Sequence, residues 1–185
     1  MKSPVVLSNL LIYRWALANL AIAAALILPA MTGHVMVLFT EDTSYISHSI
    51  VVLFAVAWLW NARETWRVSK WRNIQKRIPL TRASVLDQDK AMSKIEWLNK
   101  VPDWLVGLGL LGTVIGFKVA MGAVDQGSLS NAAGVQTSIG VLMDGITIAI
   151  NTTIVGAVCG LWLEVNNRIL KTAAESYWAD RRMPQ

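Results

Sequence analysis

Four long apolar runs constrain this 185-residue chain more than any other feature of its sequence. A helix needs about 20 apolar residues to cross a hydrocarbon layer of about 30 Å. The runs at 15–39, 104–124 and 135–163 are long enough, and the run at 46–60 approaches that length with its flanks. Because 54% of the residues are apolar and 16% charged, we predict an all-α membrane protein with four transmembrane helices.

Positive charge gathers on one side of these runs. Segment 61–102 carries ten Lys and Arg residues against four acids, whereas the loops around Glu41 and Asp125 carry none. Cytoplasmic loops collect Lys and Arg, so we expect both termini in the cytoplasm. Six tryptophans fall near the expected cytoplasmic boundary, where indole rings favour the headgroup layer: Trp15, Trp58, Trp60, Trp66, Trp104 and Trp162.

The runs divide the chain into four parts. We expect helices 1 and 2 in 1–62, a cytoplasmic helical segment in 63–102, helices 3 and 4 in 103–168 and a cytoplasmic tail in 169–185. The segment should continue the second span, break at Ile78-Pro79-Leu80 and resume as helix from about Ser84. Pro29 should kink the first span, since membrane helices tolerate proline; cleavage of that span as a signal peptide is the alternative.

The net charge of +5 does not indicate nucleic-acid binding, because the basic residues lie at the ends of the spans. Membrane lipids with anionic headgroups are the expected partner. His34 and His48 flank the acidic pair Glu41-Asp42, but two histidines in a short acidic loop are more typical of solvated side chains than of a metal site. The chain has no phosphate-binding loop and no nucleophile motif, so we predict no enzymatic activity and no cofactor.

Small residues form a stripe on the third span. At about 100° per residue, Gly109, Gly112, Thr113, Gly116 and Ala120 lie on one helix face. Such faces let membrane helices pack closely, which alone would explain the glycines. The smooth surface also leaves room for a helix from another chain, with a hydroxyl at its centre.

The fourth span has two polar faces. Asp144, Thr147 and Asn151 share one face, and Thr152 and Thr153 share another with small residues, namely Gly145, Ala149, Gly156 and Gly160. A buried Asp costs about 2.5–3.5 kcal/mol at a helix centre, so intramembrane polar groups suggest function. A helix with two such faces is expected to be central in its assembly.

Two threonines fall at the same depth in these spans. Thr113 is ten residues beyond Asp103 and Thr153 eleven residues before Glu164, which puts both hydroxyls about 15–17 Å above the cytoplasmic boundary. We expect them to form one layer. Lys118 lies opposite the small stripe and either extends to the interface or pairs with a carboxylate such as Asp144.

These residues together resemble the two core helices of the MotA/TolQ/ExbB proton channel family. The run LGLLGTVIGF at 108–117 matches its L-L-G-T-x-x-G segment, and 149–156 matches its A-L-x-x-T-x-x-G segment. The resemblance covers about residues 100–168. It implies that Thr113 and Thr153 line the ion pathway. The residues themselves leave open whether Asp144, Thr147, Asn151 and Lys118 form an additional polar pathway or a contact between protomers. The spacing of the small residues also predicts that four glycines pack the helices: Gly109, Gly112, Gly116 and Gly156.

The resemblance further implies a homopentamer in a bacterial inner membrane, surrounding two copies of a single-span partner of the MotB/TolR/ExbD type. That partner would carry the ion-binding aspartate, and ion flow would drive mechanical work, as in a stator. Ile148 departs from the pattern, because ExbB and TolQ have a glutamate there. H⁺ is the expected ion, with Na⁺ as the alternative, and a structural or holin-like oligomer without ion coupling is the alternative function.

Overall fold

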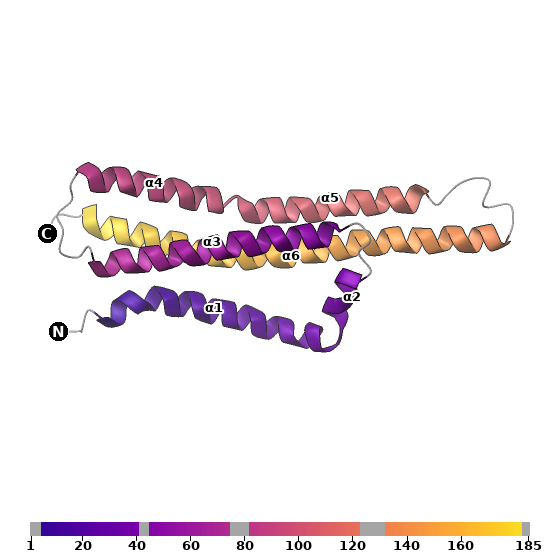
Figure 1. Ribbon diagram of the computed structural model, residues 1–185, viewed down its shortest axis with the longest axis horizontal. Coiled ribbons are helices and arrows are strands. Elements are labelled where there is room, and N and C mark those ends of the chain that lie inside the picture. The colour runs from indigo at the N-terminus through magenta and orange to yellow at the C-terminus, as the bar shows by residue number, and fades with distance from the viewer. Residues whose placement is uncertain (1–4, 41–44, 75–81, 123–131, 183–185) are drawn as a thin grey trace. The chain divides into compact units, whose positions relative to one another are not determined.

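The computed structural model describes residues 5–40, 45–74, 82–122 and 132–182, where every regular element is a helix (Figure 1). Four stretches are long and apolar enough to cross a membrane, as predicted: Leu10–Met31, Ile46–Lys70, Asp89–Gly122 and Ala132–Ser176. In chain order the helices are α1 (Val5–Met31), α2 (His34–Thr40), α3 (Ile46–Ile74), α4 (Arg82–Leu98), α5 (Val101–Gly122) and α6 (Ala132–Arg182).

The first apolar run forms two helices rather than the single kinked helix that we expected. α1 ends at Met31, two residues after Pro29, and α2 begins at His34. Gly33 has a φ of 81°, a left-handed conformation that glycine adopts without steric cost. Its N–H donates to the Ala30 carbonyl at 3.2 Å, which closes the end of α1. The stretch of this run that is long and apolar enough to cross a membrane therefore ends at Met31, before Phe39.

The second span is longer than its apolar run suggests. α3 has 29 residues, so its polar half extends the short run at 46–60 into one continuous helix, as predicted. The expected break at Ile78-Pro79-Leu80 lies outside the described residues. α4 begins at Arg82, two residues before the predicted start.

A tight turn separates α4 from α5. The N–H groups of Asn99 and Lys100 donate to the carbonyls of Ile95 and Trp97, at 3.0 and 3.1 Å. α5 then begins at Val101 with Pro102 in its first turn. Proline is tolerated there because the N–H that it lacks would have no partner within the helix. The turn sets the start of the third span.

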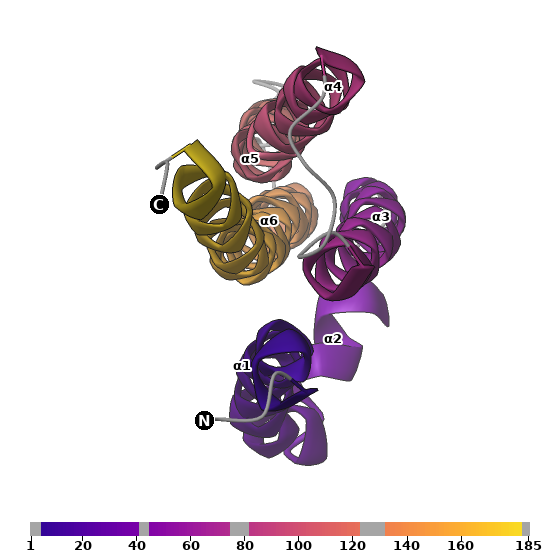
Figure 2. The same ribbon diagram turned by 90° about the vertical axis from the view of Figure 1, so that its left-hand side faces the viewer.

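The chain divides into two compact units, and each is described by itself. The terminal unit comprises 1–25, 55–102 and 161–185. Parts of α1, α3, α4 and α6 form it and appear as separate rods in Figure 2. They share an apolar core of six buried residues: Leu11, Val68, Ile95, Leu170, Ala173 and Ala174. The segment around α4 thus has no core of its own and packs with both ends of the chain.

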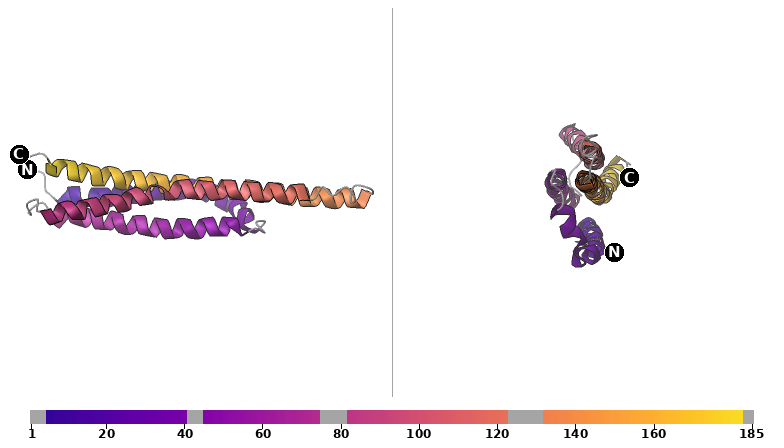
Figure 3. Two further views of the ribbon diagram at one scale, coloured as in Figure 1. Left: turned by 90° about the horizontal axis from the view of Figure 1, so that it is seen from above. Right: turned by 90° about the vertical axis from the view of Figure 1, so that its right-hand side faces the viewer.

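The central unit comprises 26–54 and 103–160. Its main feature is an antiparallel pair formed by α5 and the first part of α6, which run side by side (Figures 1 and 3). Leu105 at the start of α5 is fully buried, and Ile148 and Val155 of α6 are 4% and 5% exposed. This pair carries both threonines of the predicted layer.

Candidate functional site

Glycines bring α5 and α6 into backbone contact. A Cβ atom at Gly116 would lie 2.5 Å from the Gly145 carbonyl oxygen and 2.6 Å from the Ala149 nitrogen. Real Cβ atoms do not approach other atoms so closely. Only a residue without a side chain fits at this point, so the two helices are as close here as their backbones allow.

The same contact continues along the pair. A Cβ at Gly156 would lie 2.8 Å from the Leu105 carbonyl oxygen, and one at Gly109 would lie 3.0 Å from that of Thr152. At Gly112 it would overlap the Thr152 side chain, which is fully buried. The four glycines to which we assigned packing therefore all lie between α5 and α6.

This arrangement changes our interpretation of the small-residue stripe. We expected its smooth surface to leave room for a helix of another chain, but α6 of the same chain occupies it. The reason is that α6 has its own stripe, Gly145, Ala149 and Gly156, at matching positions. Two complementary stripes in one chain pack together without the loss of freedom that association with a separate chain brings.

Thr113 and Thr153 meet at the edge of this contact. Their Oγ1 atoms lie 2.5 Å apart, so the two hydroxyls form one layer, as predicted, while their depth in a membrane stays a prediction. The Thr153 hydroxyl also lies 2.8 Å from the Ala149 carbonyl oxygen, and the Thr113 hydroxyl 3.2 Å from that of Gly109. Both side chains are half-buried, whereas the glycines beside Thr113 are buried, so the two threonines lie at the edge of the contact between α5 and α6.

The second polar face of α6 does not form one cluster. Asp144 is exposed, Thr147 is half-buried and Asn151 is 6% exposed. The Nδ2 atom of Asn151 is buried without a hydrogen-bond partner among the described residues. Lys118 is exposed and forms no ion pair with Asp144. The role of these four residues in a pathway or a protomer contact stays a prediction.

The loop beside the two histidines is only partly described. His48 lies near Tyr45, with ring centroids 5.8 Å apart. Glu41 and Asp42 and the side chain of His34 lie outside the described residues, so our expectation of a solvated acidic loop stays a prediction.

A buried amide network in the terminal unit was not predicted. Asn19 in α1 accepts hydrogen bonds from the indole N–H groups of Trp58 and Trp162, at 2.9 and 2.7 Å. Its own Nδ2 donates to Asn166 Oδ1 at 2.7 Å and to the Trp15 carbonyl at 2.8 Å. A single amide in the first apolar helix thus connects α1, α3 and α6.

A second pair of amides extends this network. Asn61 Nδ2 donates to Asn167 Oδ1 at 2.7 Å, and Asn167 Nδ2 donates to the Leu98 carbonyl at 2.8 Å. Asn61 also accepts a hydrogen bond from the Trp15 indole at 3.0 Å. We expected Trp15, Trp58 and Trp162 to lie near the cytoplasmic boundary, which stays a prediction. The sequence did not predict that their indole N–H groups donate to the buried Asn19 and Asn61.

The sequence does contain a signal for this network. Asn19 lies within an apolar run, and Asn166 and Asn167 lie just beyond the last apolar run, after Glu164 and Val165. Amides in such positions need partners on neighbouring helices, because lipid offers none. The signal predicts that partners exist but does not name them.

Comparison with known proteins identifies one relationship. The model of a family described as the MotA/TolQ/ExbB proton channel family matches residues 76–183. The matched region contains both threonines and the glycine contact between α5 and α6. Neither the curated proteins nor the solved structures contain a match to this chain.

Proposed function

The chain belongs to the MotA/TolQ/ExbB proton channel family, and from this membership we propose that it is the channel subunit of a membrane motor driven by the proton-motive force. Five copies surround two copies of a single-span partner in a bacterial inner membrane, and the complex couples ion flow to mechanical work. The observation that carries this proposal is the hydroxyl pair of Thr113 and Thr153, 2.5 Å apart and belonging to half-buried side chains.

Threonine hydroxyls suit a site that must serve a carboxyl group in two protonation states. Each hydroxyl has one hydrogen to donate and two lone pairs that accept. A free lone pair accepts a hydrogen bond from a protonated carboxyl of the partner. When that carboxyl loses its proton, rotation of the Thr113 hydroxyl away from Gly109 lets it donate to the carboxylate. The pair therefore stabilises both states without itself changing charge.

The proton-binding carboxylate belongs to the partner. Ile148 occupies the place where ExbB and TolQ have a glutamate, and it is 4% exposed within its own chain. Asp144 lies one helical turn away from Ile148 and is exposed. Helical phase places it nearly opposite Thr153 on α6, so it lies away from the hydroxyl pair. This chain then supplies hydroxyls, and the partner supplies the group that binds and releases the proton.

The membrane potential is the source of the work. Moving one charge across it releases about 2.3 kcal/mol per 100 mV. The segment between the second and third spans has about 40 residues and no core of its own, so it offers little surface for turning a rotor. Force leaves the complex through the outer domain of the partner.

A structural or holin-like oligomer is the second candidate. The observation that favours it is that the small residues of α5 and α6 pack against each other within one chain. In that case the hydroxyls serve only to join the two helices. Measurements of ion flux and of oligomer mass distinguish the two candidate functions.

The test replaces each hydroxyl by a methyl group of the same shape. Thr113→Val and Thr153→Val, each co-expressed with the partner and reconstituted into vesicles, should lower proton flux at least about ten-fold, because a lost hydrogen bond to a charged group costs about 1.5–3 kcal/mol. A pH-sensitive dye inside the vesicles measures the flux, and native mass spectrometry measures the oligomer.

Thr137→Val is the matched control. Thr137 is an exposed residue of α6 whose hydroxyl donates to the Ala133 carbonyl at 3.0 Å, so its loss should leave flux unchanged. Normal flux in both test variants would remove the hydroxyls from the ion pathway. A collapsed oligomer in both would support the structural function.

A further inference from the structure

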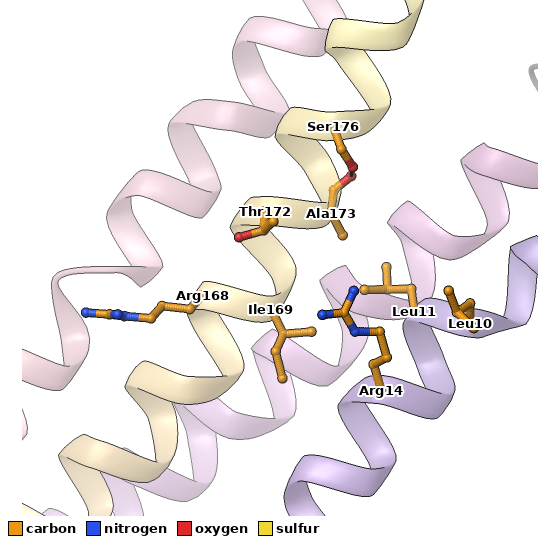
Figure 4. A pocket seen from close by; sticks show the side chains of 8 residues that line it. All are labelled: Leu10, Leu11, Arg14, Arg168, Ile169, Thr172, Ala173 and Ser176. Carbon is orange, nitrogen blue, oxygen red and sulfur yellow. Dashed lines mark hydrogen bonds between the residues drawn. The ribbon is translucent and has the colours of Figure 1, made fainter.

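A groove in the terminal unit lies between α1 and the last part of α6. It has a volume of about 280 Å³, and Figure 4 shows its lining. Leu10 and Leu11 of α1 and Ile169 of α6 form an apolar wall. Arg14, Arg168 and Thr172 add polar groups. The groove thus combines apolar surface with two cations.

The two arginines differ in their environment. Arg168 Nε donates to Glu164 Oε1 at 2.8 Å, which neutralises its charge in part. Figure 4 shows the Arg14 guanidinium turned toward Ile169, whereas Arg168 extends away from Arg14. No carboxylate among the described residues pairs with Arg14. The nearest acid farther along α6, Glu175, pairs with Lys171 at 3.9 Å. Arg14 therefore leaves the groove with an uncompensated positive charge.

The position of the groove along the spans indicates what it meets. Arg14 is five residues into the apolar stretch Leu10–Met31, and Arg168 is eight residues before the end of the stretch Ala132–Ser176. Both belong to ends of spans, where lipid headgroups lie. Basic pockets between helices at this level bind anionic headgroups.

We propose that this groove is a binding site for an anionic glycerophospholipid. The Arg14 guanidinium forms paired hydrogen bonds with two phosphate oxygens, which its planar fork matches. An acyl chain lies against Leu10, Leu11 and Ile169. A net negative headgroup is required, because the amine of a zwitterionic headgroup would compete with Arg14 for the phosphate. The site is independent of the ion pathway, so either proposal can fail without the other.

The experiment measures lipid retention by the purified full-length complex. Native mass spectrometry counts lipids bound after exposure to micelles that contain phosphatidylglycerol or phosphatidylcholine. The wild type should retain phosphatidylglycerol selectively. Arg14→Gln should lower that retention at least about five-fold, which corresponds to about 1 kcal/mol per surface cation. Arg168→Gln should have a smaller effect, because the Arg168 guanidinium already pairs with Glu164.

Two further variants make the test specific. Arg14→Lys keeps the charge but loses the planar fork, so its retention should lie between those of wild type and Arg14→Gln. Arg63→Gln removes an exposed cation of α3 outside the groove and should leave retention unchanged. Arg14, Arg63 and Arg168 are all exposed, so the four variants should keep the helix content of wild type by circular dichroism.

Several outcomes would overturn the site. Equal retention of the two lipids, or full retention by Arg14→Gln, would show that Arg14 does not select a headgroup. Displacement of the lipid by millimolar inorganic phosphate would reveal a free-phosphate site. A smaller oligomer mass in Arg14→Gln with unchanged lipid retention would identify the groove as a contact with a second copy of this chain.

Discussion

Asn19 is the residue whose replacement should affect the fold most directly through hydrogen bonds. Asn19→Leu keeps the side-chain volume but removes the acceptor of the Trp58 and Trp162 indole N–H groups and the donor to Asn166 Oδ1. Each unpaired buried group costs about 1–3 kcal/mol in water-soluble proteins and about 0.6–1.7 kcal/mol per bond in membranes. We expect a loss of about 2–4 kcal/mol, measured as the unfolding midpoint of the detergent-solubilised protein in increasing dodecyl sulfate.

Asn151→Leu is the control at the same scale. Asn151 is 6% exposed, and its Nδ2 has no hydrogen-bond partner among the described residues. Removing an unpaired amide loses no hydrogen bond and removes a desolvated polar group. The unfolding midpoint should therefore stay the same or rise. A similar loss in both variants would mean that the network around Asn19 does not act through its hydrogen bonds.

The contacts of some residues can be predicted from the sequence alone, whereas those of others cannot. The meeting of Thr113 and Thr153 was predictable, because helix rise and phase set the depth and face of every residue once the spans are known. The partners of Asn19 were not predictable in the same way. They belong to helices far apart in sequence, and which helices become neighbours depends on packing that periodicity does not encode.

At the scale of elements, the contact between α5 and α6 depends on glycine at defined positions. Gly116→Ala would place a methyl group 2.5 Å from the Gly145 carbonyl oxygen, so the helices must separate and lose their close packing. We expect an unfolding midpoint lowered by an equivalent of about 1–3 kcal/mol. Separation also lengthens the distance between Thr113 and Thr153, so proton flux should fall with it.

Gly107→Ala is the matched change on the same helix. A Cβ at Gly107 meets no atom within 4 Å, and alanine favours a helix over glycine by about 1 kcal/mol. Its midpoint should be unchanged or higher. Equal destabilisation by both substitutions would indicate that helix propensity, not contact, explains the effect.

The bounds of a helix could be predicted from the sequence where a single strong pattern determined them. Apolar length located all four stretches that could cross a membrane, and the basic character of 61–102 did not prevent α3 from continuing as helix to Ile74. The end of α1 was less apparent, because apolar residues continue after it. α1 continues through Pro29 and ends just before the left-handed Gly33, and the hydropathy of a run contains no information about backbone conformation.

At the scale of the whole molecule, the proposed motor requires a second protein. The described residues of this chain contain no carboxylate at the hydroxyl pair, since Ile148 is apolar and Asp144 is exposed. Vesicles that hold this chain alone should therefore show no more proton flux than empty vesicles. Flux should appear on co-expression with a single-span partner and disappear when the intramembrane aspartate of that partner is replaced by asparagine.

The composition of the complex gives an independent measurement. If the proposed assembly is right, native mass spectrometry should show five chains of 20.4 kDa with two partner chains. A change of the partner's aspartate should remove flux without altering this mass. Flux from this chain alone would place the proton-binding group within it and make Asp144 the next residue to replace. An assembly of another stoichiometry would refute the pentamer while leaving the threonine test intact.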